Sequence, residues 1–322
     1  MERLCKTRCW KRALIAVILG MAVAFNTHAL VTTSKENGAQ VSSFEGVRAM
    51  GHVGAMVDLG PRPLGTKALE QTRTYIESEL RAIGLEPRRD EFVASTPVGE
   101  VPMANIIAEI PAMSGASGKI LLLASHFDTK LYDGFEFLGA NDGGSSTGAL
   151  LEIGRVLSAT PPPVPIWLVF FDGEEAVGDW AGENNTYGSR HMAQRMLRDG
   201  NIEEIGALVL LDMIGDAGLV LEYEMNSTEW LRDLVWSVAD EVGHGEHFGH
   251  NANWMSDDHQ RFTEVGVPAL DLIDFNYGPA NRYWHSPMDT LDKLSEESLQ
   301  AIGDTVLAAI PRIAERLRSH EE

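Results

Sequence analysis

An apolar segment that changes abruptly into an acidic one constrains most strongly what this chain can fold into. Residues 166–171 read Ile-Trp-Leu-Val-Phe-Phe, and three consecutive prolines precede them at 161–163. An unbroken apolar run of this length predicts a strand that is buried on both faces, as in the middle of an α/β sheet. Asp172, Glu174 and Glu175 follow the run. Because ligands of α/β sheets gather beyond the carboxyl ends of the strands, we expect a functional site here.

Three carboxylates so close together repel one another unless a cation or a shared proton neutralises them. Taken alone, the triplet is also compatible with a solvated acidic turn. Glu174 and Glu175 are adjacent, so their side chains point to opposite faces if the segment is extended. One of them could then bind a metal while the other faces a substrate.

The rest of the chain alternates between strand-like and helix-like patterns. Further strand-like runs are present at 103–110, 119–125, 205–214 and 267–273. Amphipathic patterns predict helices at 66–84, 150–157, 189–197, 231–242 and 299–317. Pro311 lies inside the last of these and is expected to kink or split that helix. The alternation predicts a single α/β domain over residues 43–322.

The N-terminus has the pattern of a leader. Five basic residues precede an apolar run from Ala13 to Phe25, and small residues follow at the positions of a cleavage site. This layout predicts a secretory signal peptide over residues 1–29, followed by a loose lead-in over 30–42. The run is shorter than the roughly 20 residues of a spanning helix, so an uncleaved anchor is the less favoured alternative. We therefore expect a secreted or periplasmic protein without stable membrane insertion.

Cysteine usage and charge exclude several classes of function. Both cysteines, Cys5 and Cys9, lie in the predicted leader, so the mature chain would contain neither a disulfide nor a thiol nucleophile. The chain has 47 acidic and 26 basic residues, a formal net charge of -21. Such a surface repels nucleic acid and anionic lipid, which argues against binding to either.

Residues of metal-ligand type recur at or after several of the predicted strands. They are His126, Asp128, Asn141, Asp142, Glu174, Glu175, Asp212 and His285. Each has an ordinary explanation in isolation: Asp142 could cap a helix, and His285 could lie on the surface. Together, histidine and carboxylates without sulfur suit zinc in a site that keeps one position open for a substrate.

The same residues carry a resemblance to a known family. The motifs His-x-Asp, Gly-Ala-x-Asp, Asp-Gly-Glu-Glu, Leu-Asp and His-Ser-x-x-Asp-Thr occur in this order from about residue 60 onward. The set resembles the zinc exopeptidases of the M28 type. This resemblance implies a mixed, mostly parallel twisted sheet flanked by helices, with zinc at the strand ends. Two groups of that family compete, the two-zinc aminopeptidases and the one-zinc glutaminyl-peptide cyclotransferases, which close an N-terminal glutamine into pyroglutamate.

Four details are more similar to the cyclotransferases. They are Trp180 after the Asp-Gly-Glu-Glu motif, the Tyr-Gly-Ser-Arg-His segment at 187–191, the pair Asp257-Asp258 before His259, and Trp284 directly before His285. A tryptophan is more often part of a core than of a pocket, so this alternative stays open for both indoles. A stretch over 244–259 contains His244, His247, His250 and His259 and could suggest a further metal site. It is instead expected to be solvated, because its glycines predict a flexible turn.

Carried over residue by residue, the resemblance implies a complete site. Asp142, Glu175 and His285 would bind one zinc ion, and Glu174 would be the general acid and base with Asp212 and Asp257 as partners. Trp180 and Trp284 would line the substrate pocket. The implied substrates are peptides with N-terminal glutamine or, more slowly, glutamate, and we expect a monomer. His126 and Asp212 would complete a second zinc site in an aminopeptidase. A catalytically inactive binding domain is the third alternative, disfavoured because all motif acids are present.

Overall fold

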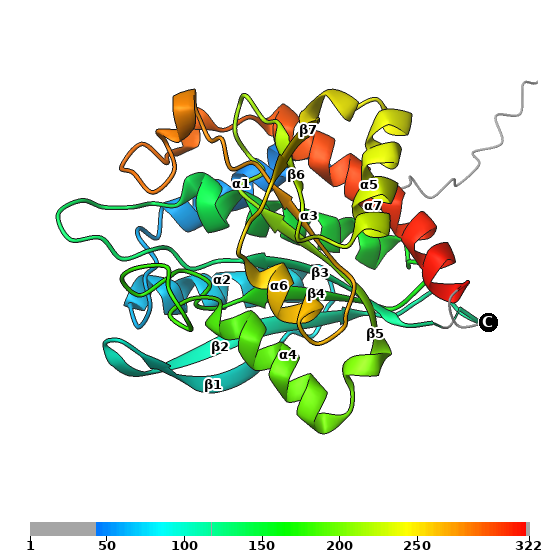
Figure 1. Cartoon of the computed structure of the whole chain (residues 1–322), viewed down its shortest axis with the longest axis horizontal. Coiled ribbons are helices and arrows are strands. Elements are labelled where there is room, and N and C mark those ends of the chain that lie inside the picture. The colour runs from blue at the N-terminus through cyan, green and yellow to red at the C-terminus, as the bar shows by residue number, and fades with distance from the viewer. Residues whose placement is uncertain (1–42, 117, 320–322) are drawn as a thin grey trace, which may run out of the picture. The chain divides into compact units, whose positions relative to one another are not determined.

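A six-stranded sheet forms the centre of the computed structural model, which describes residues 43–116 and 118–319 (Figure 1). The predicted signal peptide and lead-in lie outside the described residues. The strand order is β1-β2-β4-β3-β5-β8. The strands are β1 (Arg88–Thr96), β2 (Gly99–Ile110), β3 (Ile120–His126), β4 (Ile166–Phe171), β5 (Ile205–Asp212) and β8 (Ala269–Ile273). Neighbours from β4 to β8 pair in parallel, whereas β2 is antiparallel to β1 and β4. The predicted mixed, mostly parallel sheet is confirmed.

Helices cover both faces of this sheet. Strand side chains alternate between two apolar clusters, as the two-residue period of a strand requires: Leu121 and Leu123 of β3 belong to one cluster, and Leu122 belongs to the other. The first cluster contains side chains of α1 (Gly46–Val57), α2 (Lys67–Ala82), α3 (Ser146–Ala159), α5 (Glu229–Val242) and α7 (Glu296–Arg318). The second contains side chains of α4 (Tyr187–Asp199) and α6 (Asp258–Thr263).

Every strand and helix predicted above is present, with shifted boundaries. Thr66 caps α2, where its hydroxyl accepts from the Leu69 N–H at 3.2 Å, and Gly84 follows the helix with a φ of +85°. One alternative for the last helix is wrong: α7 continues through Pro311 without a split. Pro311 lies on the exposed face of α7, where water can hydrogen-bond the carbonyl group that the proline leaves without a donor.

Among the α-helices and strands of the described residues, five were not predicted. They are α1, β1, α6, and the strands β6 (Leu221–Glu224) and β7 (Phe248–Asn253), which form a separate parallel pair. The edge strand β1 buries little more than Asp90 and Ala94, so its sequence lacks an apolar pattern. Among the described residues, no helix has both the length and the apolar character that crossing a bilayer requires.

Candidate metal centre and active site

The parallel strands carry the candidate residues to one edge of the sheet. His126 is the last residue of β3, Asp212 is the last residue of β5, and the acidic segment begins directly after β4 ends at Phe171. His126 pairs in register with Phe171, so the two strands end at the same level. The placement beyond the carboxyl ends of the strands agrees with the general position of sites in α/β sheets.

Asp142, Glu175 and His285 form the first candidate metal site. His285 Nε2 lies 3.3 Å from Asp142 Oδ2 and 3.3 Å from Glu175 Oε1. Both carboxylates are buried, and besides His285 the cationic group near Glu175 is Lys130 Nζ, 4.0 Å from Oε2. A buried pair of carboxylates is costly unless a cation compensates it. Two carboxylates and one imidazole that leave a position open fit a catalytic zinc site.

Protonation of His285 competes with metal binding at this site. Burial lowers the pKa of His285, but the hydrogen bonds to Asp142 and Glu175 outweigh burial and raise that pKa to about 9. A metal ion needs the same nitrogen lone pair in its deprotonated form, so binding a metal would release this proton. The site therefore attracts a positive charge, either a proton or a metal ion.

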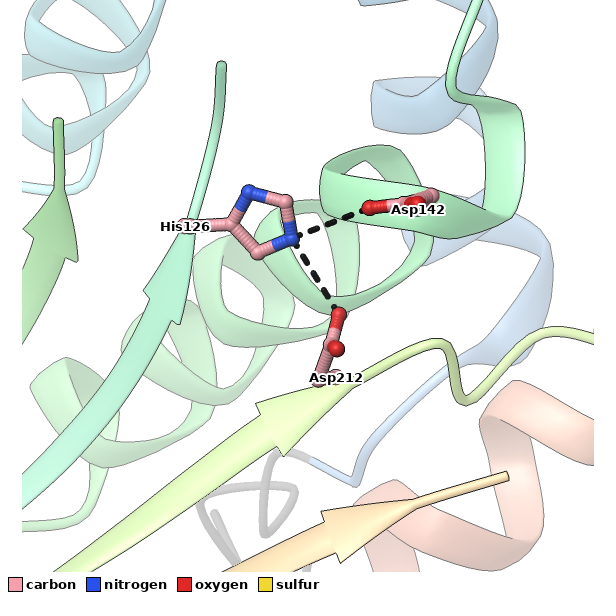
Figure 2. A group of neighbouring side chains, drawn as sticks. All are labelled: His126, Asp142 and Asp212. Carbon is pink, nitrogen blue, oxygen red and sulfur yellow. Dashed lines mark hydrogen bonds and ion pairs between the residues drawn. The ribbon is translucent and has the colours of Figure 1, made fainter. Parts of the chain in front are cut away.

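A second candidate set shares Asp142 with the first. Figure 2 shows the His126 imidazole between Asp142 and Asp212, with Nε2 at 3.3 Å from Asp142 Oδ1 and 3.2 Å from Asp212 Oδ1. The other ring nitrogen, Nδ1, lies 3.5 Å from Asp128 Oδ1. Burial lowers the pKa of His126, yet the three aspartates together raise it well above the usual value. The geometry thus accommodates either a second cation or a charged imidazolium.

Glu174 has different surroundings from the adjacent Glu175. It is buried, and burial raises the pKa of Glu174 well above its usual value; His126 opposes this shift, and Asp257 adds to it. Burial, and next the negative charge of Asp212, raise the pKa of Asp257 to about 6. Burial also raises the pKa of Asp212. A carboxyl group that holds its proton near neutral pH can act as an acid and as a base.

Two aspartates that the sequence analysis left without a role hold this site through the main chain. Asp128 accepts from the N–H groups of Glu174 at 3.0 Å and Glu175 at 3.2 Å. Asp289 accepts from Asn141 N–H at 2.7 Å and Asp142 N–H at 3.1 Å. Each aspartate therefore fixes a ligand-bearing turn. Both belong to the quoted motifs, which was the only signal for them in the sequence.

Arg62 ties the loop between β3 and Asp142 at both of its ends. This side chain is fully buried, and it donates to the carbonyl oxygens of Phe127 at 2.9 Å, Leu138 at 2.8 Å and Gly139 at 2.9 Å. The Arg62 N–H also donates to Thr129 Oγ1 at 2.8 Å. Nothing in the sequence pattern pointed to this arginine, because its partners are main-chain atoms distant in sequence.

The candidate residues surround one cavity of about 430 Å³. The eight side chains that the resemblance assigns to a one-zinc site all line it: Asp142, Glu174, Glu175, Trp180, Asp212, Asp257, Trp284 and His285. His126, Asp128 and Asn141 do not line it. Trp284 stacks on His285, with ring centroids 4.0 Å apart and an interplanar angle of 17°. Both tryptophans therefore lie at the cavity, although Trp180 is 40% exposed and lies at its opening.

The expectation of a solvated stretch over 244–259 is wrong for His259. This residue is fully buried, with Nε2 at 3.4 Å from Glu224 Oε2 and Nδ1 at 3.5 Å from Asp271 Oδ2. His259 is part of α6, a helix that the glycine-based interpretation overlooked. The burial follows from α6 packing against β5 and β8, a tertiary contact that local composition does not reveal.

A mostly parallel sheet with an imidazole and carboxylates beyond its strand ends defines a metallo-exopeptidase type of fold and site. The sequence signature of peptidase family M28 matches residues 105–310, and the chain belongs to this family.

Relatives within the family are glutaminyl cyclases and exopeptidases by name. The chain is 29% identical to the glutaminyl-peptide cyclotransferase of Drosophila melanogaster over 255 residues, 71% of this chain and 70% of that protein. It is similar to the structure of an Acidobacteriales bacterium glutaminyl cyclase, with a TM-score of 0.81, 37% identity, and coverage of 85% of this chain and 96% of the other. It is also similar to the structure of a Zn-dependent exopeptidase from Parabacteroides distasonis, with a TM-score of 0.75 and 29% identity. That match covers 84% of this chain and 99% of the other.

Proposed function

We propose that this protein is a glutaminyl-peptide cyclotransferase. It converts an N-terminal glutamine, and more slowly a glutamate, of a peptide into pyroglutamate, with ammonia as the product from glutamine. The observation that carries the proposal is Glu174, a buried carboxyl group with a raised pKa, which lines the same cavity as the first metal site and two indoles. The names of the relatives support the same activity.

Asp142, Glu175 and His285 would hold one zinc ion. Their donor atoms lie within 4.8 Å of one another, and the two buried carboxylates suit a cation. Zinc supplies a Lewis acid that polarises a carbonyl group, here the γ-carbonyl of the substrate glutamine. Trp284 stacks on the ligand His285 and so holds the imidazole in its orientation.

Glu174 would carry the proton that the reaction has to move. The α-amine of the substrate attacks the γ-carbonyl carbon, so a C–N bond forms in the ring and the bond to the amide nitrogen breaks. Glu174 accepts the proton that the α-amine loses and returns it to the departing ammonia. Asp257 keeps negative charge near Glu174, which favours its protonated form between the two transfers, and Asp212 acts in turn on Asp257.

The indoles would shape the substrate. Trp180 and Trp284 line the cavity from different segments of the chain. Their rings would hold the glutamine side chain folded back toward its own amine, which shortens the path to ring closure. They would also exclude water, which would otherwise hydrolyse the amide.

A two-metal aminopeptidase is the second candidate, favoured by one observation. His126, Asp142 and Asp212 form a second set of donor atoms within 4.8 Å, and Asp142 is common to both sets. In that function Glu174 would activate a water molecule for hydrolysis of the N-terminal peptide bond.

The two functions differ in product and in metal content. Purified protein with one zinc per chain is expected to release ammonia from glutaminyl dipeptides and to leave a leucyl fluorogenic substrate intact. Two zinc ions per chain together with release of leucine would overturn the cyclotransferase proposal in favour of the aminopeptidase. Neither activity in protein that lacks bound zinc would favour an inactive binding domain.

Two further parts of the proposal concern the localisation and the oligomeric state of the enzyme. We propose export from the cytoplasm, on the basis of the leader pattern in residues 1–29. We also propose that the chain acts as a monomer, because every residue invoked for catalysis comes from one chain and lines one cavity.

A further inference from the structure

The cavity has a buried floor and an exposed mouth. Five of its carboxylates and the side chains of Met213, Met255 and Ile273 are buried. Its exposed lining residues come from two short segments, and we call these residues the mouth: Gly178, Asp179 and Trp180 from the first segment, and Trp254 and Ser256 from the second. The proposed reaction occupies the floor and, apart from Trp180, leaves the mouth without a role.

The exposed tryptophans gather at this mouth instead of being scattered over the surface. The structure describes six of the seven tryptophans, and only Trp180 and Trp254 among those six are exposed, at 40% and 65%. Both line the same cavity. Single exposed apolar residues need no explanation, but apolar side chains that gather at a pocket mark a binding surface. Tryptophan is also the residue type most enriched among binding hot spots.

The main chain beside Trp254 is fixed before any ligand arrives. The next residue, Met255, donates its N–H to Glu224 Oε1 at 2.9 Å, and its carbonyl oxygen accepts from Asn226 Nδ2 at 2.7 Å. The Met255 side chain is buried in a cluster with Met213 and Ile273 in the cavity wall. The main chain that carries this indole is preorganised, so little backbone conformational entropy would be lost when a ligand packs on it.

The occupant follows from the proposed function, on which this inference rests. When the N-terminal glutamine reacts at the floor, the remainder of the peptide leaves through the mouth. The side chain of the second residue is therefore the first part of the substrate that passes the exposed indoles. We propose that Trp254, together with Trp180, forms a subsite for the second residue of the substrate that favours large apolar and aromatic side chains.

The test compares selectivity in wild-type protein and in the variant Trp254→Ala. The ratio of kcat/KM for Gln-Phe-amide to that for Gln-Gly-amide is expected to fall about tenfold in the variant, the size of one good aromatic contact. The loss is expected in KM, because the second residue does not take part in the reaction. Trp254→Phe is expected to keep most of the selectivity, since it restores an aromatic face.

Leu197→Ala is the matched control. Leu197 is another large apolar residue, 51% exposed on α4, and it does not line the cavity, so the selectivity ratio should not change. A wild-type ratio near one, or equal loss for both peptides in a folded Trp254→Ala protein, would overturn the subsite. A loss that affects Gln-Lys-amide instead of Gln-Phe-amide would also overturn it, because a cation–π site would then explain the indole. These results presuppose cyclisation by the wild-type protein; its absence would overturn the proposed function itself.

Discussion

Glu174 and Glu175 are chemically identical neighbours that the fold separates into two roles. Glu175 lies 3.3 Å from His285 and belongs to the first metal set, whereas Glu174 has Asp257 and His126 as its electrostatic neighbours. The separation depends on Asp128, whose two carboxylate oxygens accept from the two consecutive N–H groups and fix the turn. Without that turn, the two side chains would be free to exchange places.

This separation predicts the behaviour of Glu174→Gln. We expect turnover to fall about 10²- to 10⁴-fold, the usual contribution of a general acid and base. Bound zinc, measured by atomic absorption, should be unchanged, because Glu174 is not one of the three ligands. Glu183→Gln, an exposed glutamate near the same cavity segment, is the control and should keep full activity. Undiminished turnover in Glu174→Gln would refute the role assigned to Glu174.

At the scale of single residues, the sequence predicted the side chains that meet at the cavity and missed those that hold them there. The eight side chains that the resemblance assigns to a one-zinc site line it, because each lies in or beside a motif of recognisable chemistry. Arg62, Asp128 and Asp289 act instead on main-chain atoms. The motifs contain both aspartates but do not indicate their main-chain contacts, and no motif contains Arg62.

At the scale of elements, α1 is the informative omission. Its sequence contains three glycines, which weaken a helical pattern, yet Ala49, Val53 and Met56 are buried along one face. The spacing of these buried residues, first four and then three positions, was the sequence pattern that indicated a helix. Gly148 on the neighbouring helix α3 allows α1 and α3 to pack closely. A Cβ atom at Gly148 of α3 would lie 2.6 Å from the Ala49 carbonyl oxygen and 2.8 Å from Val53 Cγ2.

The contact predicts opposite effects for the same substitution on the two helices. Gly148→Ala should lower the free energy of unfolding by about 1–3 kcal/mol, because the new methyl group forces α1 away. Gly51→Ala on the exposed side of α1 meets nothing within 4 Å and should raise it by about 0.5–1 kcal/mol through lower chain entropy. Urea denaturation followed by circular dichroism measures both. A loss of stability in both variants would contradict the packing argument.

At the scale of the whole molecule, the buried acids concentrate at one edge of the sheet. Burial raises the pKa values of Glu174, Glu175, Asp212 and Asp257, so ionising them all costs stability. The chain as a whole also has a formal net charge of -21. A divalent cation at the cavity would offset part of this repulsion in the folded state only.

Zinc is therefore expected to stabilise the fold. At free zinc of about 100 times Kd, the gain is about 2.7 kcal/mol, which corresponds to a rise in Tm of roughly 5–10 °C for a domain of this size. Differential scanning calorimetry after chelation and after zinc addition measures the rise. Asp142→Asn should abolish it, since Asp142 belongs to both metal sets, and Glu246→Gln, an exposed acid, should retain it. An equal rise in the Asp142→Asn variant would place the zinc elsewhere.

Fold class was predictable at this scale because alternation of strands and helices is a property of the whole sequence. The central strands β3, β4 and β5 were found from apolar runs, as buried parallel strands allow. The β6–β7 pair was not, since Phe248 is the one buried residue of β7. The formation of such a strand depends on pairing with a neighbouring strand rather than on its own composition.

The three main-chain contacts of Arg62 have a consequence for how such an enzyme can diversify. Since the guanidinium donates to Phe127 at one end of the loop and to Leu138 and Gly139 at the other, insertions or deletions between Lys130 and Leu138 would leave His126 and Asp142 in place. They would reach His285 only through the rings of Tyr132 and Phe137 that contact it. Evolution could thus remodel the entrance repeatedly while the chemistry underneath is inherited unchanged.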